Sequence, residues 1–239
     1  MRLASEYNCV APRIKGFIPL SMLDWPGQIC SVIFLGGCNF RCPACHNHKL
    51  VVNPDSLPDF SMSEILSYLD GRKGWIDGVT ITGGEPTVNP GLEALLEQIV
   101  NPLGLRTKID TNGSNPALIK RLIDQNLISA VSMDIKAPLD FESYSRVCGV
   151  LSDIDKILHS IDIIKASGID FFFRTTVVPG LVAERELAEI KNTIGHDTPY
   201  MIQPFRNIDT LDPHLKGFPE YEMERFESMK ARYGTGLFS

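Results

Sequence analysis

Three of the six cysteines, Cys38, Cys42 and Cys45, form the pattern C-x3-C-x2-C. Thiolates are soft ligands that bind zinc, copper(I) or iron–sulfur clusters. A structural zinc site needs four ligands, and His46 directly after the triplet could supply the fourth. A cubane iron–sulfur cluster usually takes four cysteines, so three leave one iron open for a substrate or cofactor. The spacing alone leaves a cluster, a zinc site and three unrelated thiols as alternatives.

Further polar clusters follow apolar stretches of the chain. They are Gly83-Gly84-Glu85-Pro86, Asp110-Thr111-Asn112-Gly113, Asp134 with Lys136, and Arg174. Paired glycines let the backbone approach a ligand closely, but they also make ordinary turns, and the Asp-Thr-Asn-Gly sequence is itself typical of turns. An exposed Asp–Lys pair contributes little to stability. A buried arginine requires an anionic or hydrogen-bonded partner. Each cluster therefore has a structural interpretation beside the functional one.

The polar clusters have a regular position in an alternation of strands and helices. Apolar, β-rich runs predict strands at residues 29–35, 78–82, 105–110, 128–134, 169–178 and 200–205. Helical patterns lie between them, at 61–69, 91–100, 115–125, 154–166 and 184–194, and a last charged helix is expected within 219–233. This order predicts an α/β fold, an open parallel sheet covered by helices that forms a partial (β/α)6 barrel of the TIM type. A doubly wound sheet is the alternative, but no G-x-G-x-x-G follows the first strand.

Each polar cluster follows the carboxyl end of a predicted strand. That edge is where α/β barrels and open parallel sheets build their active sites. We therefore expect the cysteine triplet, the paired glycines and the charged residues to meet at one edge of the sheet.

The ordered motifs resemble a known superfamily. C-x3-C-x2-C followed by Gly-Gly-Glu-Pro is similar to the radical S-adenosylmethionine (SAM) superfamily. GGCNFRCPACHN, TGGEPT, DTNG, MDIK and FFFRTTVVPG resemble the activating enzymes of glycyl-radical enzymes. The opening KGFIPLSMLDWPGQICSVIFL is most similar to activating proteins of anaerobic ribonucleoside-triphosphate reductases, in the branch close to pyruvate formate-lyase activating enzymes. The resemblance covers roughly residues 15–206, and five motifs in this order rarely coincide by chance.

The resemblance implies a [4Fe–4S] cluster on Cys38, Cys42 and Cys45, with the fourth iron bound by the amino and carboxylate groups of SAM. An electron from a reduced flavodoxin- or ferredoxin-type donor would cleave SAM to methionine and a 5′-deoxyadenosyl radical. That radical would take a hydrogen atom from a glycine of a partner glycyl-radical enzyme, expected to be anaerobic ribonucleoside-triphosphate reductase. A radical SAM enzyme with another protein or small-molecule substrate, and a zinc-binding interaction module, are the alternatives.

The resemblance also implies SAM contacts. These are Gly83, Gly84, Glu85, Lys136 and Arg174, with Asn47 and Arg206 as further candidates. Asp110 and Asp134 are implied to hold a monovalent cation beside the SAM carboxylate. The partner of Arg174 would be that carboxylate or an internal one. Ala44 departs from the family pattern, because many members carry an aromatic residue there beside adenine; Phe40 or His46 would then contact adenine.

Composition limits the remaining classes. The 239 residues predict one domain, 1–239, with a core at about 15–206 and an extension, 207–239, that contains a helix. A net charge of −6 gives no electrostatic reason to bind nucleic acid. The longest apolar runs are too short to cross a membrane. The first residues hold no apolar signal core, so export is not expected. Oxygen would destroy the cluster that the resemblance implies, so an anaerobic cytoplasm is the expected location. Cys9, Cys30 and Cys148 match no motif, and we expect ordinary thiols there.

Overall fold

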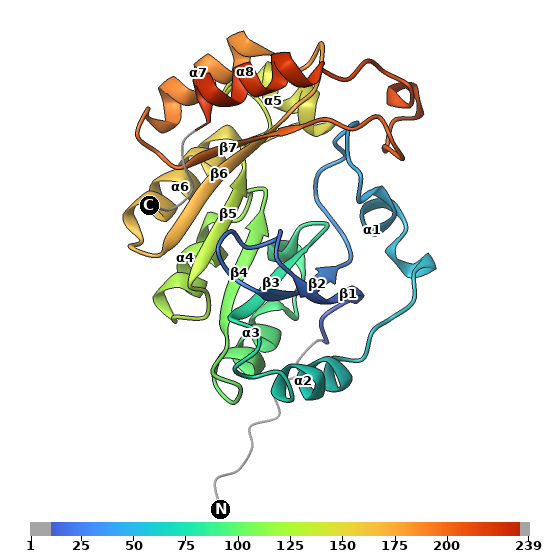
Figure 1. Ribbon diagram of the computed structural model, residues 1–239, viewed down its shortest axis with the longest axis vertical. Coiled ribbons are helices and arrows are strands. Elements are labelled where there is room, and N and C mark those ends of the chain that lie inside the picture. Colours follow the sequence, from blue (N-terminus) through green and yellow to red (C-terminus); the bar gives the residue numbers. More distant parts are fainter. Residues whose placement is uncertain (1–10, 235–239) are drawn as a thin grey trace, which may run out of the picture.

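The computed structural model describes residues 11–234, so Cys9 and the first ten residues lie outside the described part. Seven strands form one sheet in the order of the sequence (Figure 1). Their bounds are β1 (Ile14–Ser21), β2 (Cys30–Leu35), β3 (Gly78–Gly83), β4 (Arg106–Thr111), β5 (Ala130–Asp134), β6 (Asp170–Val177) and β7 (Tyr200–Pro204). Strands β2 to β7 are parallel, whereas β1 pairs with β2 in the antiparallel direction.

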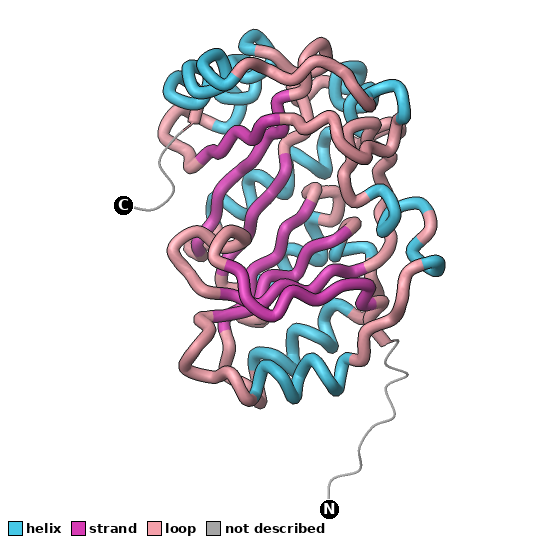
Figure 2. Tube along the Cα trace, turned by 45° about the vertical axis from the view of Figure 1, so that its right-hand side comes forward, coloured by secondary structure: helices cyan, strands magenta, loops and turns pink. Residues whose placement is uncertain are grey.

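Helices connect the parallel strands and cover the outer side of the curved sheet (Figure 2). They are α1 (His48–Val52), α2 (Met62–Asp70), α3 (Leu92–Val100), α4 (Pro116–Asp124), α5 (Phe141–Cys148), α6 (Ile154–Ala166), α7 (Glu184–Ile194) and α8 (Met223–Tyr233). Six strand–helix units confirm the predicted open, partial barrel. Among residues 11–234, no helix is both long and apolar enough to span a membrane.

Three elements were not predicted from the sequence: β1, α1 and α5. Strand β1 lies at the sheet edge and carries Gly16, Pro19 and several exposed side chains, so it lacks the continuous apolar pattern of a central strand. Helix α5 is short, but it has a start signal: the side chain of Asp140 accepts a hydrogen bond from the backbone of Ser143 (2.8 Å). The edge strand adds an antiparallel pair to the predicted parallel sheet.

The two faces of the sheet carry different side chains. Side chains such as Ile33, Ile81 and Ile109 are fully buried in the main core between the sheet and the helices. The alternate residues of the strands point to the inner, concave face. On that face Trp25 and Val32 form a smaller apolar cluster. Because side chains alternate, the polar groups of the inner face can sit directly beside a continuous apolar core.

The paired glycines at the end of β3 are required by packing against the end of β2 and the residues that follow it. Gly83 has φ +123°, and a Cβ atom there would lie 2.3 Å from the carbonyl oxygen of Leu35. A Cβ atom on Gly84 would lie 1.9 Å from the carbonyl oxygen of Gly37. The backbone N–H of Glu85 donates to that same carbonyl (2.8 Å). The expected close approach is therefore made to the end of β2 and the residues after it. These residues lead directly into the cysteine triplet.

We expect Gly84→Ala to lower the free energy of unfolding by about 3 kcal/mol, since the clash is with backbone and the strand ends must separate. Urea unfolding measures this loss. The matched control is Gly71→Ala, because Gly71 has φ −71° and its added Cβ would meet atoms only at 3.6 Å or beyond. Equal stability of the two variants would contradict the assigned role of Gly84.

Candidate active site at the carboxyl edge of the sheet

The loop after β2 carries the cysteine triplet. Within this loop the backbone N–H of Cys45 donates to the carbonyl of Cys42 (3.0 Å), and that of Phe40 donates to the sulfur of Cys38 (3.3 Å). All three thiols are half-buried. They line one cavity of about 230 Å³.

The cavity receives side chains from the carboxyl ends of the parallel strands. From β3 to β7 these include Thr82, Asp110, Asp134, Thr176 and Gln203. The structure thus brings together the residues expected at this edge. The predicted ones that line the cavity are Cys38, Cys42, Cys45, Asn47, Gly83, Gly84, Glu85, Asp110, Asp134, Lys136 and Arg174. Phe40, Ala44 and His46 line it too.

Arg206 is the predicted site residue that the structure does not bring to the cavity. Its side chain is 54% exposed and forms an ion pair with Glu220 (3.1 Å). Strand β7 ends at Pro204, and Glu220 of the C-terminal segment also accepts a hydrogen bond from the backbone of Asn207 (2.8 Å). The C-terminal segment holds the guanidinium through Glu220, and the contact of Arg206 with SAM stays a prediction.

The three thiols differ in acidity. Burial raises the pKa of Cys38 to about 12 and also raises that of Cys45. A hydrogen bond from the side chain of Cys148 lowers the pKa of Cys42 to about 7, although burial opposes this shift. Burial, followed by the contact with Cys42, raises the pKa of Cys148, so this thiol keeps its proton. Within the described residues, no three His, Cys, Asp or Glu side chains are grouped closely enough to hold a single metal ion.

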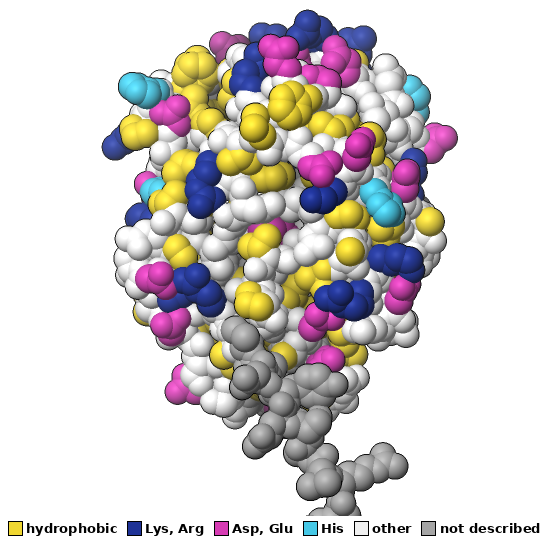
Figure 3. Space-filling model, turned by 180° about the vertical axis from the view of Figure 1, so that it is seen from behind, with side chains coloured by type: hydrophobic (Ala, Val, Ile, Leu, Met, Phe, Trp, Pro, Cys, Tyr) yellow, Lys and Arg dark blue, Asp and Glu magenta, His cyan; other side chains and the backbone are white. Residues whose placement is uncertain are grey.

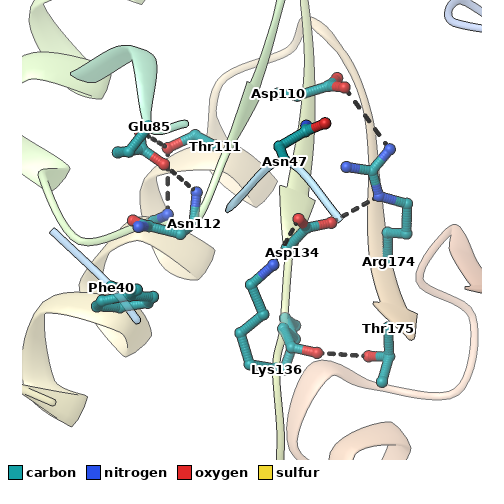
Figure 4. Close-up of polar contacts among 12 residues, drawn as sticks. Phe40, Asn47, Glu85, Asp110, Thr111, Asn112, Asp134, Lys136, Arg174 and Thr175 are labelled. Carbon is teal, nitrogen blue, oxygen red and sulfur yellow. Dashed lines mark hydrogen bonds and ion pairs between the residues drawn. The ribbon is translucent and has the colours of Figure 1, made fainter. Parts of the chain in front are cut away.

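Charged side chains form a compact network on the inner face (Figure 4). Asp134 and Arg174 are register partners on β5 and β6, and Asp134 accepts from Arg174 Nε (2.6 Å) and Lys136 Nζ (2.7 Å). Arg174 also lies 3.6 Å from Asp110, which pairs with the buried Lys108. Burial acts to raise the pKa of Asp134, but Arg174 and then Lys136 outweigh it and hold that pKa well below its ordinary value. The sequence left the SAM carboxylate and an internal carboxylate as possible partners of Arg174. The structure shows internal carboxylates, those of Asp134 and Asp110.

Glu85 joins the ends of β3 and β4 (Figure 4). Its Oε1 accepts from the backbone and hydroxyl of Thr87 (3.0 and 2.6 Å) and from the hydroxyl of Thr111 (2.7 Å). Its Oε2 accepts from the backbone N–H of Asn112 (2.6 Å). Burial raises the pKa of this carboxyl even though these hydrogen bonds act in the opposite direction. The carboxylate accepts hydrogen bonds from Thr87, Thr111 and Asn112, so Glu85 fixes the shape of the site.

We expect Glu85→Gln to lower the free energy of unfolding by about 1–3 kcal/mol, because the amide NH2 group must face at least one buried donor. Urea unfolding at neutral pH is the measurement. Glu93→Gln is the matched control, since Glu93 pairs with Arg121 on the surface and its change should cost less than about 1 kcal/mol. A cost no larger than the control's would argue against this structural role.

The C-terminal segment that follows β7 is bonded directly to the cysteine loop. The backbone N–H groups of Leu211 and Asp212 donate to the carbonyls of Cys45 (3.1 Å) and Pro43 (3.0 Å). His46 donates from Nε2 to the carbonyl of Arg206 (2.7 Å) and stacks on Phe205, with ring centroids 6.1 Å apart. The extension therefore supports the loop that carries the thiols, a role that no sequence motif indicates.

Sequence reasoning also missed Thr176 and Gln203 in the cavity and Cys148 behind Cys42. The strand ends at which Thr176 and Gln203 stand were predicted, so alternation along these strands could have identified both. No comparable signal existed for Cys148, which is the last residue of the unpredicted helix α5.

Comparison with known proteins identifies the class. The model of the radical SAM superfamily matches residues 32–191, which is most of the chain and includes all three cysteines. The chain therefore belongs to the radical SAM superfamily. This membership favours an iron–sulfur cluster over the zinc site that the cysteine spacing also allowed.

Individual relatives show which kinds of radical SAM protein this chain is similar to. A Methanocaldococcus jannaschii protein described as a glycyl-radical enzyme activating enzyme is 32% identical over 227 residues, 92% of each chain. The pyruvate formate-lyase-activating enzyme of Clostridium pasteurianum is 27% identical over 219 residues, covering 89% of this chain and 87% of that protein. In structure, Streptococcus suis SuiB bound to its precursor peptide SuiA superposes with a TM-score of 0.65 at 16% identity. That match covers 84% of this chain and 44% of SuiB, so it supports the fold alone.

The superfamily implies a [4Fe–4S] cluster and SAM, and the residues present suit both. The donors are three thiols on one loop, and thiolates are the usual ligands of iron–sulfur clusters. Carbonyl, amide and charged groups of neighbouring strand ends face the same cavity and can bind a polar, zwitterionic ligand such as SAM.

Proposed function

We propose that this protein reductively cleaves SAM and generates a glycyl radical on anaerobic ribonucleoside-triphosphate reductase. The observation that carries the proposal is the convergence of three thiols and a charged network in one cavity at the carboxyl edge of the sheet. The relative with 32% identity along nearly its whole length is described as a glycyl-radical enzyme activating enzyme, which supports this reaction class. The opening sequence supports the choice of the reductase as partner.

The chain's own residues have distinct roles in this proposal. Cys38, Cys42 and Cys45 hold the cluster, which when bound supplies the electron that cleaves the sulfonium bond of SAM. Lys136 and Arg174 place positive charge in the cavity, where they attract the SAM carboxylate. Their pairing with Asp134 keeps both cations in place before the cofactor enters.

Asn47 and Gly83 connect the cysteine loop to the neighbouring strand β3. The side-chain amide of Asn47 donates to the carbonyl of Gly83 (3.1 Å), which ties the cysteine loop to the end of β3. The other lone pair of that carbonyl is available to the amino group of SAM. Position 44 is alanine, where many members of the family carry an aromatic residue. Phe40 and His46, which both line the cavity, are the proposed contacts of adenine instead, and Phe40 is buried.

The remaining assignments complete the proposal. A reduced flavodoxin or ferredoxin serves as electron donor in an anaerobic cytoplasm. A monovalent cation near Asp110 and Asp134 belongs to the proposal as well. Such an ion has to share these carboxylates with Lys108, Lys136 and Arg174, which already pair with them.

The test is anaerobic reconstitution with iron and sulfide, followed by reduction with SAM present. We expect release of 5′-deoxyadenosine and, with the reductase added, the EPR doublet of a glycyl radical. Pyruvate formate-lyase is the comparison partner, and a reductase with its radical glycine replaced by alanine is the matched control. SAM cleavage without a radical on the reductase would contradict the choice of partner, whereas no SAM cleavage at all would contradict the reaction.

A further inference from the structure

Two neutral side chains that line the cavity are available to a ligand. Thr176 on β6 and Gln203 on β7 are register partners, so they stand side by side on the inner face of the sheet. Within residues 11–234, neither side chain hydrogen-bonds to another protein group. The charged residues of the cavity differ, because Asp134 and Arg174 already pair with each other. A ligand can therefore bond to this hydroxyl and this amide without breaking a contact in the protein.

An apolar recess adjoins this pair. It is formed by three residues that line the same cavity, Ala44, Val178 and Leu181. The buried side chain of Phe205, which directly follows β7, packs in one cluster with them. Along β6 and the residue after it, Thr176 stands between Arg174 of the charged network and Val178 of the recess. The amide of Gln203, beside Thr176, therefore lies at the border between the network and the recess.

The recess also reaches the cysteine loop. Ala44 lies in the turn between Cys42 and Cys45, where the backbone N–H of Cys45 donates to the carbonyl of Cys42 (3.0 Å). Its methyl group takes up little of the space. The ring of His46 lines the cavity as well and stacks on Phe205, with centroids 6.1 Å apart. The recess thus has aliphatic walls, a flat aromatic neighbour and hydrogen-bonding groups at its border with β6 and β7.

The charged network and the recess suit the two ends of SAM. The amino and carboxylate groups of SAM are ions and match the network of Asp134, Lys136 and Arg174. Adenine has apolar faces, whereas one edge of the base carries the N7 acceptor and the N6 amino donor. A glutamine carboxamide has both an NH2 donor and a carbonyl acceptor, and it can pair with that edge through two hydrogen bonds. A recess with an amide at its border is therefore suited to selecting this base.

We propose that Gln203 determines specificity for adenine: its NH2 group donates to N7, and its carbonyl accepts from the N6 amino group, of SAM bound with its base in the apolar recess. The proposal rests on the proposed function, because it requires SAM in this cavity. A site that hydrogen-bonds a polar edge discriminates against ligands that lack this edge, because the protein group is then left unpaired. Gln203 thus adds selection of the base to the charged network's recognition of the amino-acid end.

The test measures binding of SAM and two analogues to the reconstituted protein, with the cluster kept oxidised so that SAM is not cleaved. The first analogue has C–H in place of N7, and the second has hydrogen in place of the N6 amino group. Isothermal titration calorimetry gives the dissociation constants. We expect the wild type to bind each analogue about threefold to tenfold more weakly than SAM, the range for one hydrogen bond. Gln203→Leu should bind SAM and both analogues with similar affinity.

Two further variants separate the two hydrogen bonds and control for the substitution. Gln203→Glu keeps an acceptor but has no donor. It should still discriminate against the analogue without the N6 amino group, but no longer against the analogue without N7. Comparing ligands within one variant removes the general effect of the added charge. Gln98→Leu is the matched control, since it makes the same change at an exposed position of α3 and should keep the discrimination of the wild type.

Each outcome of these titrations decides the proposal. Equal affinity of the wild type for SAM and both analogues would overturn it. Discrimination that persists in Gln203→Leu would also overturn it, because another group would then contact the adenine edge. Loss of discrimination in Gln203→Leu, with Gln98→Leu unchanged, would support it. Failure of the wild type to bind SAM at all would contradict the proposed function as well, whereas SAM binding without discrimination would contradict the assignment of Gln203 alone.

Discussion

Replacing Cys42 with alanine will abolish both iron–sulfur loading and the reductive cleavage of SAM. In the proposed [4Fe–4S] site with three protein ligands the loop has no spare thiolate, since Cys38 and Cys45 would each bind an iron of their own. The only other described thiol near this position, Cys148, is buried on the core side of Cys42. Iron and sulfide content after anaerobic reconstitution, and 5′-deoxyadenosine release after reduction, measure the loss.

The control for Cys42→Ala is Cys30→Ala, which removes a buried thiol in β2 that is not among the residues lining the cavity. This variant should load iron and cleave SAM like the wild type. Urea unfolding of the metal-free proteins should show that both variants are folded. Wild-type iron content in Cys42→Ala would contradict the ligand assignment, and a loss shared by both variants would indicate a general effect of removing a cysteine.

Asp134→Ala will cause the second large effect, a loss of about 3 kcal/mol in the free energy of unfolding of the metal-free protein. Asp134 is the common partner of Lys136 and Arg174, at 2.7 and 2.6 Å. Its removal leaves two facing cations largely shielded from water, and breaking a buried pair in this way costs about 3–5 kcal/mol. We take the lower end because the three side chains retain 20–25% of their exposure.

The pH dependence gives a sharper signature of Asp134. Because its folded-state pKa is lowered, its stabilising contribution is present above the unfolded value of about 3.9 and is lost as pH falls through the lower folded value. The stability difference between wild type and Asp134→Ala should therefore be constant from about pH 5 to 8 and shrink below about pH 4. Burial lowers the pKa of Lys136, but Asp134 outweighs it and raises that pKa, so the difference should also shrink in strong alkali.

A surface pair provides the control for Asp134→Ala. Asp124 pairs with Lys120 along α4, and both side chains are more than half exposed. Asp124→Ala should cost less than about 1 kcal/mol. Urea unfolding at pH 3, 4, 5 and 7 compares the two variants. A cost for Asp134→Ala that matches the surface control, or that does not change with pH, would show that the network contributes little.

One face of the described surface carries charges of both signs (Figure 3). On the face shown in Figure 3, acidic and basic side chains are interspersed. The net charge of −6 is consistent with this mixed surface.

Much of this edge could be predicted from the sequence because a parallel sheet has a simple geometry. Once the runs ending at Leu35, Asp110 and Asp134 are assigned as parallel strands, the residues at and after their ends must meet at one edge. Alternation with period two then places Asp134 opposite to the core residue Met133. These rules depend on local order, which the sequence contains directly.

Other predictions were incomplete because they required knowledge of neighbours. Glu85 and the paired glycines line the cavity as expected, but the close approaches and hydrogen bonds that the structure shows for them are to adjacent strand ends. Arg206 follows the last strand as predicted, yet its side chain turns to Glu220. A motif gives the position of a residue along the chain, but the competing partners for its hydrogen bonds come from segments that the motif does not contain.

The sequence by itself determined the chemistry of the site: three thiols with one spacing, followed in order by strand-end motifs, define a radical SAM enzyme. Only the tertiary structure decided what surrounds those thiols. Residues 211 and 212 support the cysteine loop, and the carbonyl of Cys148 accepts a hydrogen bond from the backbone N–H of Arg41 in the same loop. The physical reason is separation along the chain. Local periodicity fixes which face of an element a side chain occupies. Contacts between segments distant in sequence depend on how helices and loops pack over the sheet.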